Sequence, residues 1–149
     1  PDSRRLMVSA WAPHEMKDMV LPPCHYAFQI YINNGTMDLM WQQRSADVFL
    51  GLPYDITMYG LLLELLAKDT GLKAGQLIGQ LGDCHLYNNH LEQASLYLDR
   101  PNRALPKLQL ERGVNANALG SVNIPDASEI KLLKYNPYPA IRAELSVGK

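Results

Sequence analysis

A predicted β-hairpin is the feature that most constrains how this chain folds. Residues 24–32 alternate between two sets of side chains, as in a strand whose successive residues face opposite sides of a sheet. The next residues, Asn33-Asn34-Gly35, tolerate positive φ and favour a tight turn, after which a second strand is expected over residues 36–43. One face of the first strand is expected to hold Cys24, Tyr26, Phe28, Ile30 and Ile32, and the other His25, Ala27, Gln29 and Tyr31.

Helical and strand patterns alternate along the rest of the chain. Residues 56–70 are apolar nearly all round and end at Gly71, a typical residue after a helix, which predicts a buried central helix. Asn89 with Glu92 three residues later predicts an N-cap and a helix to about Leu98. Because no β-α-β rhythm is apparent, the expected fold class is α+β. Other patterns predict strands near 4–11, 75–84, 107–111 and 130–135, a helical turn over 13–19 and a loop over 113–128.

Length and composition bound the class of protein. The chain has 149 residues, 47% of them hydrophobic, which suits one globular domain with a core. Its 14 Lys and Arg residues nearly balance its 15 Asp and Glu residues, so nucleic acid is not the expected partner. No apolar run approaches the roughly 20 residues of a membrane span, so no membrane partner is expected. Two cysteines without paired spacing favour a reducing compartment, and the expected localisation is cytoplasmic.

Cys24 is a candidate nucleophile. It follows two prolines at the start of the predicted strand, and a rigidly placed thiolate next to a cation is strongly nucleophilic. The alternative interpretation is a small core residue at the end of an apolar face. Cys24-His25 and Cys84-His85 contain the residue types that bind zinc, but neighbours on a strand face opposite sides and neither pair has the usual two-residue gap. Zinc is therefore not expected.

The dipeptide Arg44-Ser45 is a candidate phosphate site. A guanidinium fork beside a hydroxyl suits a phosphate monoester, and Arg4 and Arg5 add positive charge. The alternative is a set of solvated or salt-bridged arginines. Asp55 directly precedes the predicted helix, and spacing alone favours a helix N-cap, for which Asp is among the best residues.

Three ordered motifs stand out along the chain. They are Leu21-Pro22-Pro23-Cys24-His25, then Gln43-Arg44-Ser45-Ala46-Asp47-Val48-Phe49-Leu50-Gly51-Leu52-Pro53, then Gly82-Asp83-Cys84-His85-Leu86-Tyr87 with Asn89-His90. The opening Asp2-Ser3-Arg4-Arg5 and the closing Tyr135-Asn136-Pro137-Tyr138-Pro139 belong to the same pattern. Together these segments closely resemble the thymidylate synthase family. The resemblance covers nearly the whole chain except about residues 112–128.

The resemblance implies a homodimer that forms through a mixed sheet packed with the buried central helix. It implies a pyrimidine nucleoside monophosphate as substrate and 5,10-methylenetetrahydrofolate as one-carbon donor. Cys24 would attack C6 of the ring, and Asp47 would be a second catalytic residue. Arg4 and Arg5 would be donated across the dimer interface to bind the nucleotide, Asn89 would line the site, and Asp47 and Gly51 would face the folate. The other nucleotide-binding residues would be Gln43, Arg44, Ser45, Asp47, Asp55, His85 and Tyr87.

Asp55 departs from the pattern of the family's thymidylate synthases, which have Asn at this position. An Asn amide donates to O4 and accepts from N3–H of uracil. An Asp accepts from the amino group of cytosine, whereas facing uracil O4 would cost about 1–3 kcal/mol. The same substitution marks the family's deoxycytidylate hydroxymethylases, so 5-hydroxymethylation of dCMP is the expected activity. The alternatives are a thymidylate synthase that methylates dUMP and a nucleotide-binding remnant without catalysis.

Two further departures concern the folate side of the site and the start of the chain. Gln80-Leu81-Gly82-Asp83 replaces the family's usual Thr-Gly-Gly-Asp, and the tail runs two residues past the usual apolar end. Hydride transfer needs a dry site and hydroxymethylation needs water, so these changes favour hydroxymethylation. The family's N-terminal segment has no counterpart in these 149 residues. We therefore expect a single domain over residues 1–149 that represents the C-terminal portion of the fold.

Overall fold

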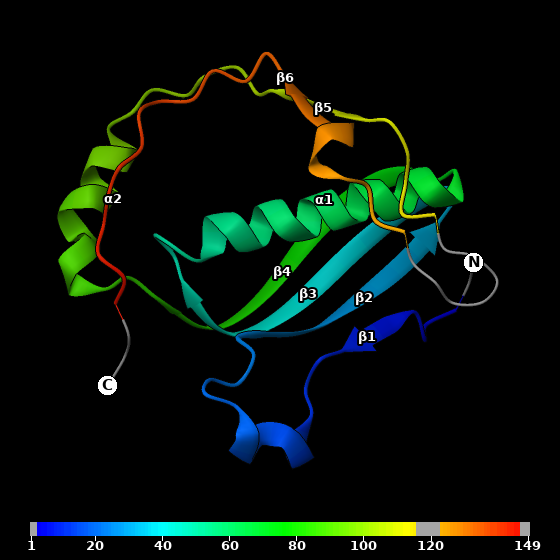
Figure 1. Cartoon of the computed structure of the whole chain (residues 1–149), viewed down its shortest axis with the longest axis horizontal. Coiled ribbons are helices and arrows are strands. Elements are labelled where there is room, and N and C mark those ends of the chain that lie inside the picture. The colour runs from blue at the N-terminus through cyan, green and yellow to red at the C-terminus, as the bar shows by residue number, and fades with distance from the viewer. Residues whose placement is uncertain (1–2, 116–122, 147–149) are drawn as a thin grey trace. The chain divides into compact units, whose positions relative to one another are not determined.

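A computed structural model describes residues 3–115 and 123–146 of the chain (Figure 1). They form two compact units, the first ending at His85 and the second beginning at Leu86. The first unit contains a four-stranded sheet and a long helix, and the second a two-stranded sheet and a short helix. No helix in this described part is long and apolar enough to cross a membrane. The expectation of one domain over residues 1–149 stays a prediction.

The predicted hairpin is confirmed in the first unit. Strand β2 (His25–Asn33) pairs antiparallel with β3 (Thr36–Asp47). Asn34 and Gly35 form the turn with φ of 48° and 76°, the positive values that a two-residue type I′ turn needs. Strand β1 (Met7–Ser9) adds an antiparallel edge next to β2. The predicted helical turn is the 3-10 helix η1 (Pro13–Asp18).

A parallel crossover completes the sheet. The chain leaves β3, forms α1 (Leu52–Thr70) and returns as β4 (Lys73–His85), which pairs parallel with β3. The strand order is β1-β2-β3-β4, so the sheet is mixed and the α+β prediction is confirmed. The segment β3-α1-β4 is a single β-α-β unit, which the sequence pattern does not reveal. Strand periodicity predicts that residues 75–84 are extended, but it does not say in which direction their partner runs.

The central helix packs along one face of this sheet, as Figure 1 shows for α1 beside β3 and β4. Tyr59, Leu63 and Ala67 recur every four residues and form the buried stripe that packs with the sheet, and the buried side chains of β3 alternate with half-exposed neighbours. Burial of this stripe is the main source of stability in the first unit, because apolar area removed from water is worth about 25 cal/mol per Å². The core cluster consists of Met37, Leu39, Trp41, Tyr59, Leu63 and Ala67.

The two ends of α1 compare differently with the sequence prediction. At the C-terminal end Gly71 adopts a left-handed conformation with φ of 68°, so the predicted helix end is confirmed. At the N-terminal end the helix begins at Leu52 rather than residue 56, with Pro53 in its first turn, where proline is favoured. Gly51 occupies the N-cap and no side chain caps the helix. The interpretation of Asp55 as an N-cap is therefore wrong, because Asp55 lies inside the first turn.

A β-bulge near the start of β2 changes which way its first residues face. The pairing with β3 shifts between His25 and Ala27, which makes Tyr26 an extra residue in the ladder. His25 Nδ1 lies 3.0 Å from the hydroxyl of Tyr59 on α1, and the ring of Phe28 also contacts Tyr59. Tyr26 and Ala27 both line an open cavity on the other face. The expected grouping of Tyr26 with Phe28, and of His25 with Ala27, is wrong because the bulge interrupts the two-residue period.

The second unit begins with the 3-10 helix η2 (Asn88–His90), followed by α2 (Leu91–Leu98). The helix ends where the sequence predicts, but its N-cap is His90 and no side chain caps it. The predicted cap by Asn89 and Glu92 is therefore wrong. Asn89 Oδ1 instead accepts a hydrogen bond from Ser146 Oγ at 2.7 Å, 57 residues along the chain.

The predicted strands of the second unit are confirmed. Strands β5 (Lys107–Leu110) and β6 (Ile130–Leu133) pair antiparallel, and the 3-10 helix η3 (Ala127–Glu129) directly precedes β6. Residues 116–122 of the predicted loop over 113–128 lie outside the described residues.

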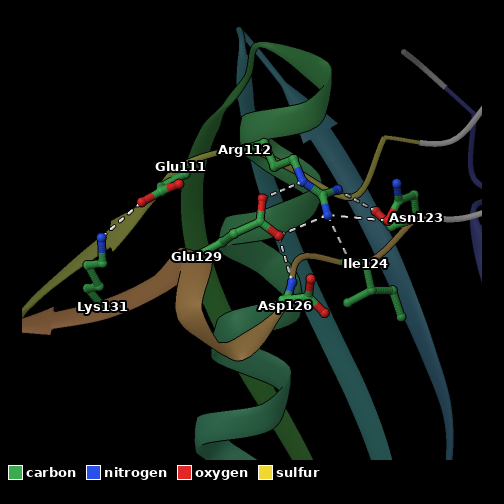
Figure 2. A network of polar contacts seen from close by, with 7 residues as sticks. All are labelled: Glu111, Arg112, Asn123, Ile124, Asp126, Glu129 and Lys131. Atoms are coloured by element: carbon green, nitrogen blue, oxygen red, sulfur yellow. Dashed lines mark hydrogen bonds and ion pairs between the residues drawn. The ribbon is translucent and has the colours of Figure 1, made fainter.

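A network of polar contacts around Arg112 stabilises residues 123–129, which directly precede β6 (Figure 2). Its guanidinium donates to both carboxylate oxygens of Glu129, at 2.7 and 3.0 Å, and to the carbonyls of Asn123 and Ile124. Glu129 Oε2 also accepts from the amide of Asp126 at 2.7 Å, and the two residues form a capping box. The hydrogen bond from Arg112, assisted by the Asp126 amide, lowers the pKa of Glu129 below its ordinary value.

Replacing Glu129 by Gln is expected to reduce the acid sensitivity of the second unit. Since the pKa of Glu129 is lower in the folded chain than in the unfolded chain, its stabilisation is complete above the ordinary value of 4.5 and is lost as the pH falls below it. Hydrogen exchange of the β5 and β6 amides at neutral and acidic pH measures this loss. Glu111→Gln is the matched control, because Glu111 makes an exposed ion pair with Lys131 at 2.9 Å. Equal acid-induced loss of protection in Glu129→Gln and the parent would contradict the prediction.

Candidate active site

Arg44 holds the segment that carries Cys24. The backbone amide of Arg44 donates to the carbonyl of Cys24 at 2.8 Å. The guanidinium donates from Nε to the carbonyl of Pro23 at 3.0 Å and from Nη2 to that of Pro22 at 2.8 Å. Three hydrogen bonds thus fix the two-proline segment against β3, and the free, half-buried Cys24 thiol lies directly before β2. Carbonyl oxygens do not neutralise a guanidinium, so Arg44 keeps its positive charge while it holds this segment.

Asp47 forms the turn that leads from β3 to α1. Its Oδ1 accepts hydrogen bonds from the amides of Phe49 and Leu50 at 3.0 and 3.4 Å. Its carbonyl accepts from the amide of Gly51 at 3.1 Å, and a Cβ at Gly51 would lie only 3.2 Å from that carbonyl. The turn therefore favours glycine at 51 and holds the Asp47 carboxylate in a fixed orientation.

The parallel pairing of β3 with β4 brings the ends of these strands together. Ser45 pairs with Asp83 and Asp47 pairs with His85. The amide of Val48 donates to the carbonyl of His85 at 3.0 Å, and His85 Nδ1 lies 3.7 Å from Asp83 Oδ1. Across residues 3–115 and 123–146, no group of three or more His, Cys, Asp or Glu side chains could hold a metal ion.

Gln43 connects β3 to Asp55 in the first turn of α1. Its Nε2 donates to Asp55 Oδ2 at 2.8 Å and to the carbonyl of Ser45 at 2.9 Å. Its Oε1 accepts from the indole Nε1 of Trp41 at 3.0 Å. Gln43 and Trp41 are only 3% and 4% exposed, whereas Asp55 is half-buried. A buried, fully hydrogen-bonded amide therefore joins Asp55 to the core.

Tyr59 joins His25 to the same cluster. Its hydroxyl hydrogen-bonds with His25 Nδ1 at 3.0 Å, and its ring stacks on Trp41 with centroids 5.4 Å apart. Burial raises the pKa of Tyr59, and the negative charge of Asp55, one helical turn earlier, raises it further. The phenol therefore remains protonated at neutral pH.

Four predicted site residues are not part of this cluster within the first unit. Arg4 and Arg5 are exposed and precede β1, at the edge of the sheet opposite β4. Tyr87 and Asn89 belong to the second unit. The residues that the structure brings together along β3 and its neighbours are Cys24, Gln43, Arg44, Ser45, Asp47, Gly51, Asp55 and His85.

Sequence reasoning missed Trp41, which hydrogen-bonds to Gln43, and Tyr59, which stacks on Trp41 and hydrogen-bonds with His25. A signal was present for each of them. Trp41 lies two residues before Gln43 and hence on the same face of the strand. Tyr59 lies four residues after Asp55 and hence on the same side of the helix. The sequence does not show that this strand face and this helix side meet.

Comparison with known proteins identifies the family of this chain. A sequence model of the family described as thymidylate synthase matches residues 1–147. The chain belongs to the thymidylate synthase family. Two thymidylate synthases of Listeria monocytogenes, from serotypes 4a and 4b, are each 46% identical to it over 147 residues. These matches cover 99% of this chain and 45% of each relative, so the chain spans about half the length of the curated relatives it matches.

Family membership confirms the resemblance seen in the motifs. The three motifs that carry it supply Cys24, the run from Gln43 to Gly51, and His85, all within the first unit. That Asp55 selects cytosine as the base stays a prediction.

Replacing Tyr59 by Phe is expected to destabilise the first unit by about 1–3 kcal/mol, because it leaves a half-buried His25 nitrogen without this hydrogen bond. The measurement is the free energy of unfolding in urea. Tyr31→Phe is the control, since Tyr31 lies on the same strand, β2, and is 54% exposed. If the two variants have equal stabilities, the contact contributes nothing.

Proposed function

We propose that this chain carries out folate-dependent one-carbon transfer to C5 of a pyrimidine nucleoside monophosphate, with Cys24 as the nucleophile. The observation that carries this proposal is the Pro22-Pro23-Cys24 segment that Arg44 holds with three hydrogen bonds, in a chain of the thymidylate synthase family. A guanidinium that came close to the thiol would favour the nucleophilic thiolate. Adding a thiolate at C6 turns C5, otherwise a poor nucleophile, into an enamine-like carbon that can attack a one-carbon unit.

The nucleotide is proposed to lie along the ends of β3 and β4. Arg44 and Ser45 would bind the phosphate, since a guanidinium fork and a hydroxyl match its oxygens. A second copy of the chain would add Arg4 and Arg5. The sugar would contact His85 and Tyr87, and Gln43, Asn89 and Asp55 would line the rest of the site.

Asp47 and Gly51 are proposed to face 5,10-methylenetetrahydrofolate, which supplies the one-carbon unit when bound. The turn supports this fit, because the amides of Phe49 and Leu50 orient the Asp47 carboxylate and Gly51 places no side chain over it. Asp47 would be the second catalytic residue, with its carboxylate placed to accept a proton near the reacting carbon.

Two overall reactions fit this chemistry. The relatives are named thymidylate synthases, which favours methylation of dUMP. The second candidate is 5-hydroxymethylation of dCMP, and Asp55 favours it. The Asp55 carboxylate accepts from Gln43, and a carboxylate can accept from the amino group of cytosine but cannot donate to uracil O4.

A second copy of the chain is the proposed partner on the sheet face away from α1. On this face Met7 is 60% exposed and Trp11 40% exposed. A covering subunit would remove these apolar side chains from water. An open cavity of about 610 Å³ on this face is lined by Met7, Ser9, Trp11, Tyr26, Ala27, Gln42 and Arg44.

Mass spectrometry of the nucleotide products tests the proposed reaction. The full-length protein that carries this chain is incubated with methylenetetrahydrofolate and with dUMP or dCMP separately. Cys24→Ser is expected to lower product formation at least about a thousandfold while nucleotide binding persists, because serine keeps the shape but not the nucleophile. Cys84→Ser is the matched control and should keep activity, since Cys84 is exposed. Retained turnover in Cys24→Ser would exclude the mechanism, and no product from either nucleotide would favour a non-catalytic remnant.

Analytical ultracentrifugation tests the proposed homodimer. The parent protein is expected to sediment as a dimer, and Trp11→Glu is expected to shift it toward monomer, because a carboxylate would be buried on an apolar face. Tyr54→Glu is the control, since Tyr54 is 77% exposed on α1. A parent protein that remains monomeric at micromolar concentration would contradict the dimer.

A further inference from the structure

The bulge in β2 turns His25, the residue directly after the candidate nucleophile Cys24, toward α1. The pairing of β2 with β3 shifts between His25 and Ala27, and His25 Nδ1 lies 3.0 Å from the hydroxyl of Tyr59 on α1. Bulges next to active sites re-aim side chains in this way. His25 therefore meets the helix one turn after Asp55, on the side of the sheet where the base is proposed to lie.

Three aromatic rings hold the Tyr59 hydroxyl in place. The Tyr59 ring stacks on Trp41 with centroids 5.4 Å apart. Its edge contacts with Phe28 and His25 have centroid distances of 6.1 and 5.6 Å. Tyr59 is only 6% exposed, so its ring has little room to turn away. The hydroxyl therefore stays at His25 Nδ1.

In this hydrogen bond the Tyr59 hydroxyl donates and the imidazole of His25 accepts. Among the described residues, His25 Nδ1 is the one hydrogen-bond partner of this hydroxyl. If Nδ1 carried a proton and donated it, the phenol proton of a buried side chain would have no acceptor. Burial, together with the charge of Asp55, raises the pKa of Tyr59 and keeps the phenol protonated. A neutral imidazole has one N–H, so its proton lies on Nε2.

The second ring nitrogen of His25 is open to a ligand. Within residues 3–115 and 123–146, Nε2 has no hydrogen bond, yet it is not one of the fully buried polar atoms. The side chain as a whole is half-buried. An N–H that reaches open space in the candidate site suits a carbonyl oxygen, which both dUMP and dCMP carry.

We propose that Tyr59 is a positioning residue that fixes the neutral His25 imidazole in its Nε2–H form, so that His25 donates a hydrogen bond to a carbonyl oxygen of the bound pyrimidine. This inference rests on the proposed function, since it takes the base to lie beside His25. The same form prevents His25 from acting as the base for Cys24, because Nε2 already carries its proton and Nδ1 accepts from Tyr59. Cys24 and His25 are thus not a nucleophile and its base, although their adjacency suggests such a pair.

Nitrogen-15 NMR of the full-length protein, labelled at histidine, tests the form of the ring in mildly alkaline buffer. Protonated and unprotonated ring nitrogens have well-separated shifts, and the His25 signals are assigned by their loss in His25→Gln. The expected result is an unprotonated Nδ1 and a protonated Nε2. A protonated Nδ1, alone or together with a protonated Nε2, would overturn the proposal.

Tyr59→Phe tests whether the hydroxyl is the origin of this form. Without that donor both forms of the neutral ring become populated, so the two nitrogen shifts of His25 are expected to move toward each other. Tyr31→Phe is the matched control, because it removes a hydroxyl that is on the same strand but 54% exposed, and it should leave both shifts unchanged. Unchanged shifts in Tyr59→Phe would overturn the role of Tyr59.

Calorimetric titration with dUMP and with dCMP, without folate, tests the contact to the base. His25→Ala is expected to weaken the binding of both nucleotides about tenfold, and Tyr59→Phe about threefold. Because Tyr59 acts through His25, adding Tyr59→Phe to His25→Ala should weaken binding no further. Equal losses from Tyr59→Phe with and without His25, or no loss in His25→Ala, would overturn the contact.

The outcomes distinguish this inference from the proposed function. The expected shifts and affinities without product from either nucleotide would support the inference and overturn one-carbon transfer. Product formation by a protein whose His25 is protonated at Nδ1 would overturn the inference and leave the reaction intact. If neither nucleotide binds, both are overturned.

Discussion

The alternation of side chains along β3 is the constraint on which the rest of the first unit depends. This strand lies between β2 and β4, and its odd-numbered residues Leu39, Trp41 and Gln43 are buried toward α1. Gln42 and Arg44 face the opposite side of the sheet. A slip of one residue would exchange the two sets and bury the Arg44 cation, so burial of one face sets the register strongly. Register in turn places Arg44 against the segment that carries Cys24.

The candidate site and the core are continuous in this unit. Asp55 contacts the buried Gln43 amide, Gln43 contacts Trp41, and the Trp41 ring stacks on Tyr59, which reaches His25 beside Cys24. The hydrogen bonds of Gln43 and the Tyr59–His25 bond link these side chains, so removing a partner from one of these bonds leaves a buried or half-buried group unsatisfied at a cost of about 1–3 kcal/mol. The functional side chains are therefore oriented by the interactions that stabilise the fold.

Much of the fold was predictable because it depends on local chemistry. The turn at Asn34 and Gly35 and the helix end at Gly71 need positive φ, which few residues supply. The predictions that failed depend on contacts elsewhere. The bulge at Tyr26 places His25 and Tyr26 on the sheet faces opposite to those predicted. The parallel pairing of β4 with β3 makes a β-α-β unit that the sequence pattern does not show. Asn89 bonds to Ser146 rather than capping a helix.

The sequence by itself determined which elements form and which chemical groups the site contains, because turns, helix ends and family motifs are properties of neighbouring residues. Cys24, Arg44 and Asp55 were recognisable in this way. Only the tertiary structure decided which way these groups face. Arg44 donates to carbonyls 21 and 22 residues away, and His25 bonds to a tyrosine 34 residues away. The direction of the Gln43 amide is set by a donor-only indole and an acceptor-only carbonyl, and hydrogen-bond direction is a property of assembled partners rather than of any one residue.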